Sequence, residues 1–297
     1  ILAQAILVQA VLAHARCSVR AGVVHPVLSS RPRSAASRTC SPEAAMSGPH
    51  YDALASLPKV YVKEKVNILE AVTAIIGQEV EMANKYSIQD ESGSEVFFAV
   101  EQTSCCMRQV KQCAPDCAPW NVTIALTQGG QNQKAFELKR DFSCTCLCFN
   151  RPVVDVIDAT SGDKIGSIKD PCACCDLTFA LRGPDDNTAL KAVGGCCQWG
   201  LCCPLPCGPC ATVSFPVKDA SSGEEVGKLE KKVPGCCKFF FAPDVDNFDV
   251  DFGGVQSPQY KALLIALAIF MDFRYFNENP NDDEGGVMGA MGGEDQS

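Results

Sequence analysis

The chain has 297 residues and a formal net charge of −9. Hydrophobic residues make up 46% and aromatic residues 7%, which is enough for a packed core and excludes a disordered composition. The acidic balance argues against a nucleic-acid partner, because such binding needs clustered lysine and arginine to release counterions.

The first segment, residues 1–45, differs in composition from the remainder. It is rich in Ala, Ser and Arg and contains a single acid, Glu43, so it resembles an organelle transit peptide. The alternative is translated upstream sequence, because Met46 begins a stretch of ordinary composition. Under both interpretations we expect it to lie outside the fold and to be disordered. Residues 46–57 are predicted to be an irregular lead-in.

Histidine usage excludes several enzyme classes. The three histidines are His14, His25 and His50, so none follows Tyr51. The body of the chain therefore has no Ser-His-Asp or Cys-His site and no histidine general base. It also contains no phosphate-binding glycine motif between a strand and a helix. We predict that the protein is not an enzyme.

Short β-type runs separated by turn residues follow from Lys59 onward. They begin with Val60 to Val62 and continue over residues 86–88, 95–100, 121–126, 135–142, 153–157, 164–168, 176–181, 189–193, 211–217, 225–229 and 239–252. Ser-Gly dipeptides recur in the turns, a pattern typical of β-hairpins. This organisation predicts a mainly β sandwich or barrel and not alternating βαβ units.

One helical segment, Tyr260 to Phe276, has no polar face over Ala262–Met271. Such a helix is buried in protein or in lipid. Ten residues rise about 15 Å, whereas a bilayer core is about 30 Å thick, so a helix enclosed by a barrel is favoured over a membrane anchor. The side chains assigned to this helix are Leu263, Leu264, Leu267, Phe270, Met271 and Asp272. An acidic, glycine-rich tail, residues 279–297, is predicted to be disordered.

The 20 cysteines allow three interpretations. A disulfide framework is the least favoured, because no clear secretory signal precedes the clusters. Structural zinc is suggested by the CxxC pairs Cys172/Cys175 and Cys207/Cys210, although about 35 residues separate them. Reversible S-acylation suits cytosolic clusters beside hydrophobic residues, and the best candidates are Cys144, Cys146 and Cys148. Most other cysteines are expected to be small buried hydrophobic residues.

An acidic strand runs from Asp244 to Phe252 and alternates carboxylates with apolar residues. In an extended strand Phe248, Val250 and Phe252 point to one side, and Asp249 and Asp251 to the other. Carboxylate oxygens are preferred calcium ligands. The candidate ligands are Asp244, Asp246, Asp249 and Asp251. The spacing is not that of an EF-hand, and a solvated strand face is the alternative.

Three segments together carry a family resemblance. Glu95 to Cys106 resembles the phospholipid scramblase strand that ends in a cysteine pair. Asp244–Phe252 followed by Tyr260–Phe276 resembles the family's proposed calcium segment and its C-terminal apolar helix, with Asp272 as the internal acid. The resemblance covers about Leu57 to Glu278. It implies a Tubby-like closed barrel of about twelve strands around a buried C-terminal helix, which places the barrel domain at residues 58–278.

The resemblance also implies a function. It is calcium-stimulated, ATP-independent, bidirectional movement of phospholipids between leaflets, at the cytosolic face of a membrane. The plasma membrane is expected, or a mitochondrial membrane if residues 1–45 are genuine. The family's proposed calcium segment usually ends with another acid, where this chain has Val255. The candidate acylation cluster has three spaced cysteines here instead of a dense run. A membrane-tethered lipid- or protein-binding module of the same fold is the alternative function, and protein partners or a homo-oligomer remain open.

Overall fold

The structure is a computed structural model. It describes residues 47–64, 82–102, 117–128, 131–144, 150–172, 176–195, 197–202, 208–232 and 247–276, all within one compact unit. The predictions for residues 1–45 and 279–297 lie outside the described residues.

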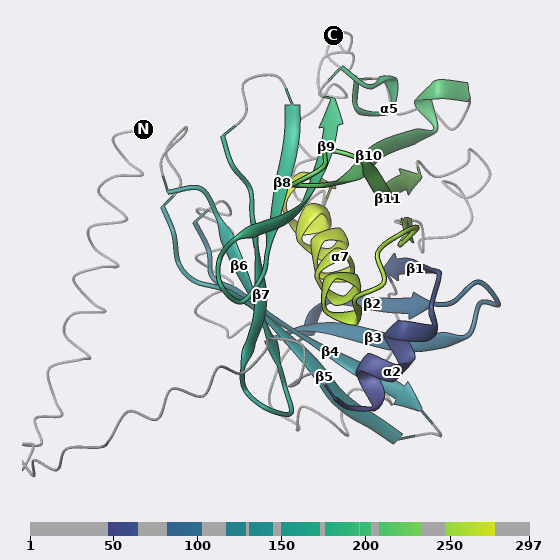
Figure 1. Cartoon of the computed structure of the whole chain (residues 1–297), viewed down its shortest axis with the longest axis vertical. Helices are drawn as coiled ribbons and strands as arrows, with labels where there is room; N and C mark the ends of the chain where they lie inside the picture. Colours follow the sequence, from purple (N-terminus) through teal and green to yellow (C-terminus); the bar gives the residue numbers. More distant parts are fainter. Residues whose placement is uncertain are drawn as a thin grey trace, which may run out of the picture. The chain divides into compact units, whose positions relative to one another are not determined.

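Twelve strands form one closed antiparallel barrel, as the resemblance implies (Figure 1). They are β1 Lys59–Glu64, β2 Met82–Gln89, β3 Glu95–Gln102, β4 Trp120–Gln128, β5 Gln131–Arg140, β6 Val153–Asp158, β7 Lys164–Lys169, β8 Asp176–Arg182, β9 Thr188–Gly195, β10 Thr212–Asp219, β11 Glu225–Lys232 and β12 Asn247–Asp251. Each strand pairs with its sequence neighbours, and β1 closes the barrel against β12, with Val62 opposite Phe248. Closure leaves no strand of this sheet with an unpaired edge.

The antiparallel order gives the barrel two different ends. Each even-numbered strand up to β10 is followed by a short turn, so these turns share one end, called here the hairpin end. Longer connections follow the odd-numbered strands and share the opposite end, called here the connection end. The connection between β9 and β10 contains the short helices α5 (Trp199–Cys202) and η2 (Gly208–Cys210).

The Ser-Gly turns predicted from the sequence are confirmed. Gly93, Gly162 and Gly223 each have a positive φ, between 75° and 82°, in three different turns of the hairpin end. A side chain is disfavoured in this left-handed region, so glycine is the natural residue there. The preceding aspartates, Asp90 and Asp219, accept backbone hydrogen bonds from the same turns. Local sequence thus specifies the hairpins independently of the core.

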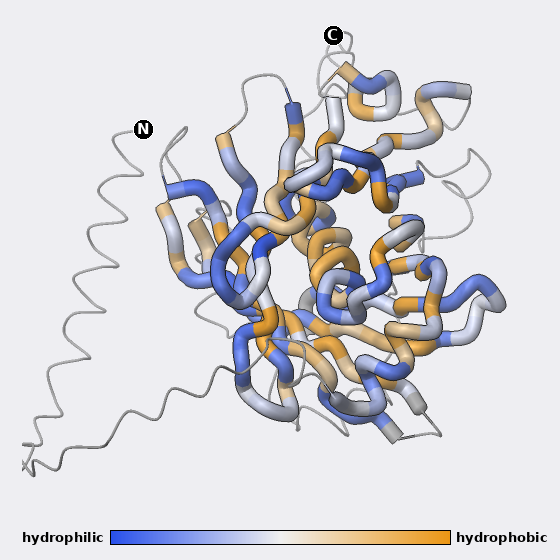
Figure 2. The backbone as a smooth tube through the Cα atoms, viewed as in Figure 1, coloured by the Kyte–Doolittle hydropathy of each residue, from blue (hydrophilic) through white to orange (hydrophobic). Residues whose placement is uncertain are grey.

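Helix α7 (Pro258–Met271) occupies the barrel interior and continues into a π-helical turn, η3 (Asp272–Phe276) (Figures 1 and 2). Residues 262–271 are each no more than 2% exposed. The helix is apolar on every side because strands surround it (Figure 2). The prediction that this segment is enclosed by a barrel is confirmed. At Gly166 of β7 the helix approaches closely, since an added Cβ would meet the Arg182 carbonyl oxygen and Leu263.

The segment before β1 corrects the sequence prediction. Residues 49–56, expected to be irregular, form helix α2 (Pro49–Ser56). Pro49 in the first turn has no N–H to lose and favours helix initiation. His50, Tyr51 and Leu54 are buried, and α2 contacts α7 at the hairpin end. This helix is hard to predict because eight residues carry a weak periodic signal and their stability comes from tertiary contacts.

Candidate functional site

The described part of the acidic segment is strand β12, between β1 and β11. Phe248 and Val250 point into the barrel and are buried, while Asp249 and Asp251 alternate with them on the outer face. The predicted orientation of these side chains is confirmed. Asp244 and Asp246 lie outside the described residues.

Asp249 is held by two lysines of the neighbouring strands. Its Oδ2 lies 3.3 Å from Lys59 Nζ on β1 and 2.6 Å from Lys232 Nζ on β11. The residue is only 4% exposed. Burial alone would lower the pKa of Lys59, but the charge and hydrogen bond of Asp249 raise it overall. A cation at Asp249 would therefore compete with two ammonium groups.

Asp251 differs from Asp249 because it is exposed at the hairpin end. Its Oδ1 accepts a hydrogen bond of 2.9 Å from Gly253 N, and Gly253 has a positive φ of 49°. The turn after β12 thus orients this carboxylate. Within the described residues, no group of three or more His, Cys, Asp or Glu is arranged to hold a metal ion.

The C-terminal end of α7 is tied to the barrel by a buried polar network. Asp272 is 1% exposed; its Oδ1 lies 3.1 Å from Lys231 Nζ, and its Oδ2 accepts a hydrogen bond of 2.7 Å from Tyr86 Oη. Burial and the nearby charge of Asp272 raise the pKa of Tyr86 well above its usual range, so the phenol keeps its proton and donates. The internal acid of the apolar helix is therefore an anchor to β2 and β11.

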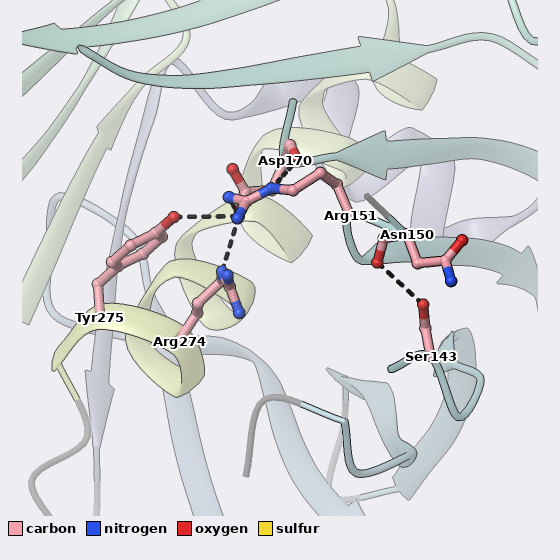
Figure 3. Close-up of polar contacts among 6 residues, drawn as sticks. All are labelled: Ser143, Asn150, Arg151, Asp170, Arg274 and Tyr275. Atoms are coloured by element: carbon pink, nitrogen blue, oxygen red, sulfur yellow. Dashed lines mark hydrogen bonds and ion pairs between the residues drawn. The ribbon is translucent and has the colours of Figure 1, made fainter. Parts of the chain in front are cut away.

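A second polar cluster, missed by the sequence analysis, lies at the connection end and joins Asp170 to Arg151, Arg274 and Tyr275 (Figure 3). Asp170, only 2% exposed, follows β7. Its Oδ2 accepts hydrogen bonds from Arg151 Nη2 at 2.5 Å, Arg274 Nε at 2.7 Å and Tyr275 Oη at 3.0 Å. Two of these donors belong to η3, so Asp170 fixes the chain as it leaves the barrel. The residues are far apart in sequence, which is why no motif pointed to them.

The N-terminal end of α7 is fixed by Lys261, which is 4% exposed. Its Nζ donates to the carbonyl oxygens of Leu54, Ala55 and Leu57 at 3.1, 3.1 and 2.7 Å. These carbonyls lie at the C-terminal end of α2, where a cation satisfies groups that the helix leaves unpaired. Burial lowers the pKa of Lys261.

The other end of α2 is joined to β6. Tyr51 Oη donates to Asp158 Oδ2 at 2.9 Å, and His50 Nε2 lies 3.4 Å from the same oxygen. Burial alone would raise the pKa of Asp158, but hydrogen bonds from Thr160 N, Tyr51 and Ser161 N lower it overall. Helix α2 therefore covers the hairpin end of α7 through contacts at both of its own ends.

The apolar helix, with its internal acid, ends inside a twelve-stranded barrel beside an acidic strand, in the order that the resemblance requires. The scramblase family model matches residues 39–278, well over half of the sequence. The chain belongs to the scramblase family.

Individual relatives of this scramblase-family chain are distant. It is 27% identical to phospholipid scramblase 1 of Mus musculus over 80% of the chain and 66% of that protein. It is 27% identical to phospholipid scramblase 2 of Bos taurus over 77% of the chain and 71% of that protein. The match to phospholipid scramblase family member 5 of Homo sapiens is 24% identical over 78% of both chains. The chain thus spans slightly less than two thirds of the length of mouse scramblase 1. No solved structure matches it.

The remaining sequence-predicted residues of the scramblase-family chain divide between the barrel core and its connections. The helix residues Leu263, Leu264, Leu267, Phe270 and Met271 are all buried. Cys144 is exposed, whereas Cys146 and Cys148 lie outside the described residues. Cys172 and Cys210 are described without their CxxC partners, so the zinc prediction stays a prediction. None of the described helices is long and apolar enough to cross a bilayer.

Proposed function

We propose that this protein is a phospholipid scramblase that moves phospholipids in both directions between leaflets, stimulated by calcium and without ATP. The observation that carries the proposal is the ordered pair of elements at the C-terminal side of the barrel, the acidic strand β12 followed by the apolar helix α7. Family membership over residues 39–278 supports the same activity. No covalent chemistry is assigned to the protein, and its target is a phospholipid membrane and not nucleic acid.

Calcium is proposed to bind through Asp244, Asp246, Asp249 and Asp251. The alternation on β12 supports Asp249 and Asp251 as outward-facing ligands about 7 Å apart along the strand. Asp249 can enter a calcium site only by exchanging Lys59 and Lys232 for the cation. Such an exchange would alter the contacts of β12 with β1 and β11 and couple calcium to the barrel wall.

Attachment to the cytosolic face of a membrane, most simply the plasma membrane, is proposed to involve S-acylation of Cys144, Cys146 and Cys148. The exposed Cys144 thiol supports this assignment. Two acyl chains are needed for stable attachment, because one chain gives only reversible binding.

Burial of α7 favours a second candidate function, a membrane-tethered module that binds lipid or protein without scrambling. Removing the helix from the barrel would expose its Leu, Ile and Phe side chains at a cost of about 1.5–3 kcal/mol each. It would also break the contacts of Asp272 and Lys261. Helix exit, or assembly of several copies, must therefore accompany any lipid path built on α7.

The deciding experiment uses the full chain reconstituted into vesicles with a fluorescent phospholipid in both leaflets. Dithionite quenches the outer leaflet alone unless lipid is scrambled. Calcium-dependent loss of the protected signal, abolished by Asp244→Ala/Asp246→Ala in sealed vesicles, is the expected result. Folded, membrane-bound protein that leaves the inner-leaflet signal intact would instead establish the tethered module.

A further inference from the structure

The topology gathers the cysteines at a single end of the barrel. Only Cys17 and Cys40 precede β1, and every later cysteine lies in a segment between an odd-numbered strand and the next even-numbered one. The segments are those after β3, β5, β7, β9 and β11. In an up-and-down barrel these strand ends are all on the same side, the connection end. The described cysteines Cys117, Cys144, Cys172, Cys197 and Cys210, which belong to four separate sequence clusters, therefore lie at the connection end.

The exposed apolar side chains of the described residues lie at the same end. Trp199 of α5 is 65% exposed, Phe142 after β5 is 45% exposed, and Val153 at the start of β6 is 37% exposed. They are the only large hydrophobic residues exposed in the part of the chain that the structure describes. Cys144 and Cys172 are exposed beside the same strand ends. Tryptophan with exposed thiols and apolar neighbours suits the boundary between water and lipid.

The hairpin end has the opposite character. Four of its turns, residues 90–94, 159–163, 183–187 and 220–224, carry acids and no lysine or arginine. The acids of these turns are Asp90, Glu91, Asp163, Asp185, Asp186 and Glu224. Among the strand residues that flank the turns, the acids Glu95, Asp158, Asp219 and Glu225 outnumber the bases Lys164 and Arg182. Hydrogen bonds from Ser221 and Ser222 hold the pKa of Asp219 at about 2, and those from Ser92 lower the pKa of Asp90. This end therefore stays negatively charged and is repelled by an anionic membrane surface.

We propose that the connection end of the barrel is its membrane-docking face, with Trp199 and Phe142 at the lipid interface and the acidic hairpin end toward water. The occupant is a phospholipid bilayer surface. In this orientation the C-terminal end of α7 faces the lipid. Acyl chains on cysteines of several connections would stabilise the same orientation of the barrel. The proposal rests on the membrane attachment in the proposed function but not on lipid movement.

The test places a fluorescent reporter at each end of the full chain, purified from cells that S-acylate proteins. Trp120 is buried and Trp199 exposed, so emission of the wild type minus that of Trp199→Phe reports the connection end. Glu91→Trp in the Trp199→Phe background reports the hairpin end. The wild type and the two variants are each bound to vesicles of phosphatidylcholine and phosphatidylserine whose acyl chains carry bromine. Bromine quenches the emission of nearby indoles only.

We expect the Trp199 emission to fall at least twofold on the brominated vesicles and the Glu91→Trp emission to change little. Trp199→Ser/Phe142→Ser should weaken vesicle binding severalfold, while Glu91→Ser should not. Equal quenching at both ends, no quenching of Trp199 in bound protein, or absence of vesicle binding would each overturn the proposal. Quenching of Trp199 without scrambling would retain this docking face and reject the scramblase activity.

Discussion

The ammonium group of Lys231 on β11 lies 3.1 Å from the carboxylate of Asp272, and both side chains are buried where α7 reaches the connection end. A buried ion pair costs desolvation energy that its attraction must offset, so breaking it leaves an uncompensated charge. This pair therefore helps to retain the apolar helix in the barrel.

Asp272→Asn is predicted to destabilise the fold by about 3 kcal/mol, because Lys231 loses a buried counter-charge at 3.1 Å. Urea unfolding at neutral pH measures the effect, and Trp120, which packs near Phe270 and Phe273, reports the same region. The double variant Lys231→Met/Asp272→Asn should lose less unfolding free energy than the sum of the losses in the two single variants. Asp251→Asn, at an exposed carboxylate, is the control and should change stability by no more than about 0.5 kcal/mol.

Lys261→Met is predicted to loosen α2 from the barrel. The apolar side chain fills similar space but leaves the carbonyls of Leu54, Ala55 and Leu57 without their ammonium donor, at a cost of about 1–3 kcal/mol. Hydrogen exchange of residues 49–56 should quicken more than that of the barrel strands. Exchange that is unchanged over α2 would contradict the role of Lys261 as its anchor.

The Asp158 contact predicts an acid-sensitive attachment of α2. The folded-state pKa of Asp158 lies below the unfolded value of 3.8, so the unfolded chain binds more protons between the two values. Its stabilisation is therefore present above about pH 4 and lost as the pH falls through the folded pKa. The unfolding free energy of wild type should exceed that of Asp158→Asn by about 2 kcal/mol at pH 7, and the difference should shrink in acid. A constant difference would contradict this assignment.

The two lysines that contact Asp249 are predicted to weaken calcium binding. Lys59→Gln/Lys232→Gln removes two positive charges next to a proposed ligand, so calcium should bind about tenfold more tightly. Isothermal titration calorimetry of the full chain measures this. Lys164→Gln, which pairs with Asp155 and Asp186 elsewhere, is a matched control with no expected effect. Unchanged affinity in the double variant would remove Asp249 from the site.

Gly166→Ala is predicted to strain the contact between β7 and α7. A Cβ there would collide with the Arg182 carbonyl oxygen of β8 and stand 2.8 Å from Leu263 Cδ1 of α7, so β7 must shift away from both neighbours at a cost of about 1–3 kcal/mol. Gly195→Ala has nothing within 4 Å and should be nearly neutral. Thermal unfolding of both variants makes the comparison, and similar melting temperatures would contradict the close approach.

Features that depend on short-range interactions were predictable from the amino-acid sequence. Turn residues such as Gly93 and Gly162 separated the strands, alternation set the inward face of β12, and the all-apolar run Ala262–Met271 required enclosure. These features depend on neighbours in the chain, so they can be read without knowing which distant strands meet.

Which distant residues share a site became visible in the folded barrel alone. Asp170 accepts hydrogen bonds from Arg151 and from η3. Lys261 caps a helix that begins more than 200 residues earlier, and Asp249 forms an ion pair with Lys232 of a neighbouring strand. The strand order also places the described cysteines of four separate sequence clusters at one end. These relationships depend on strand order and register, which no local pattern encodes, because the partners meet only after the barrel has closed around α7.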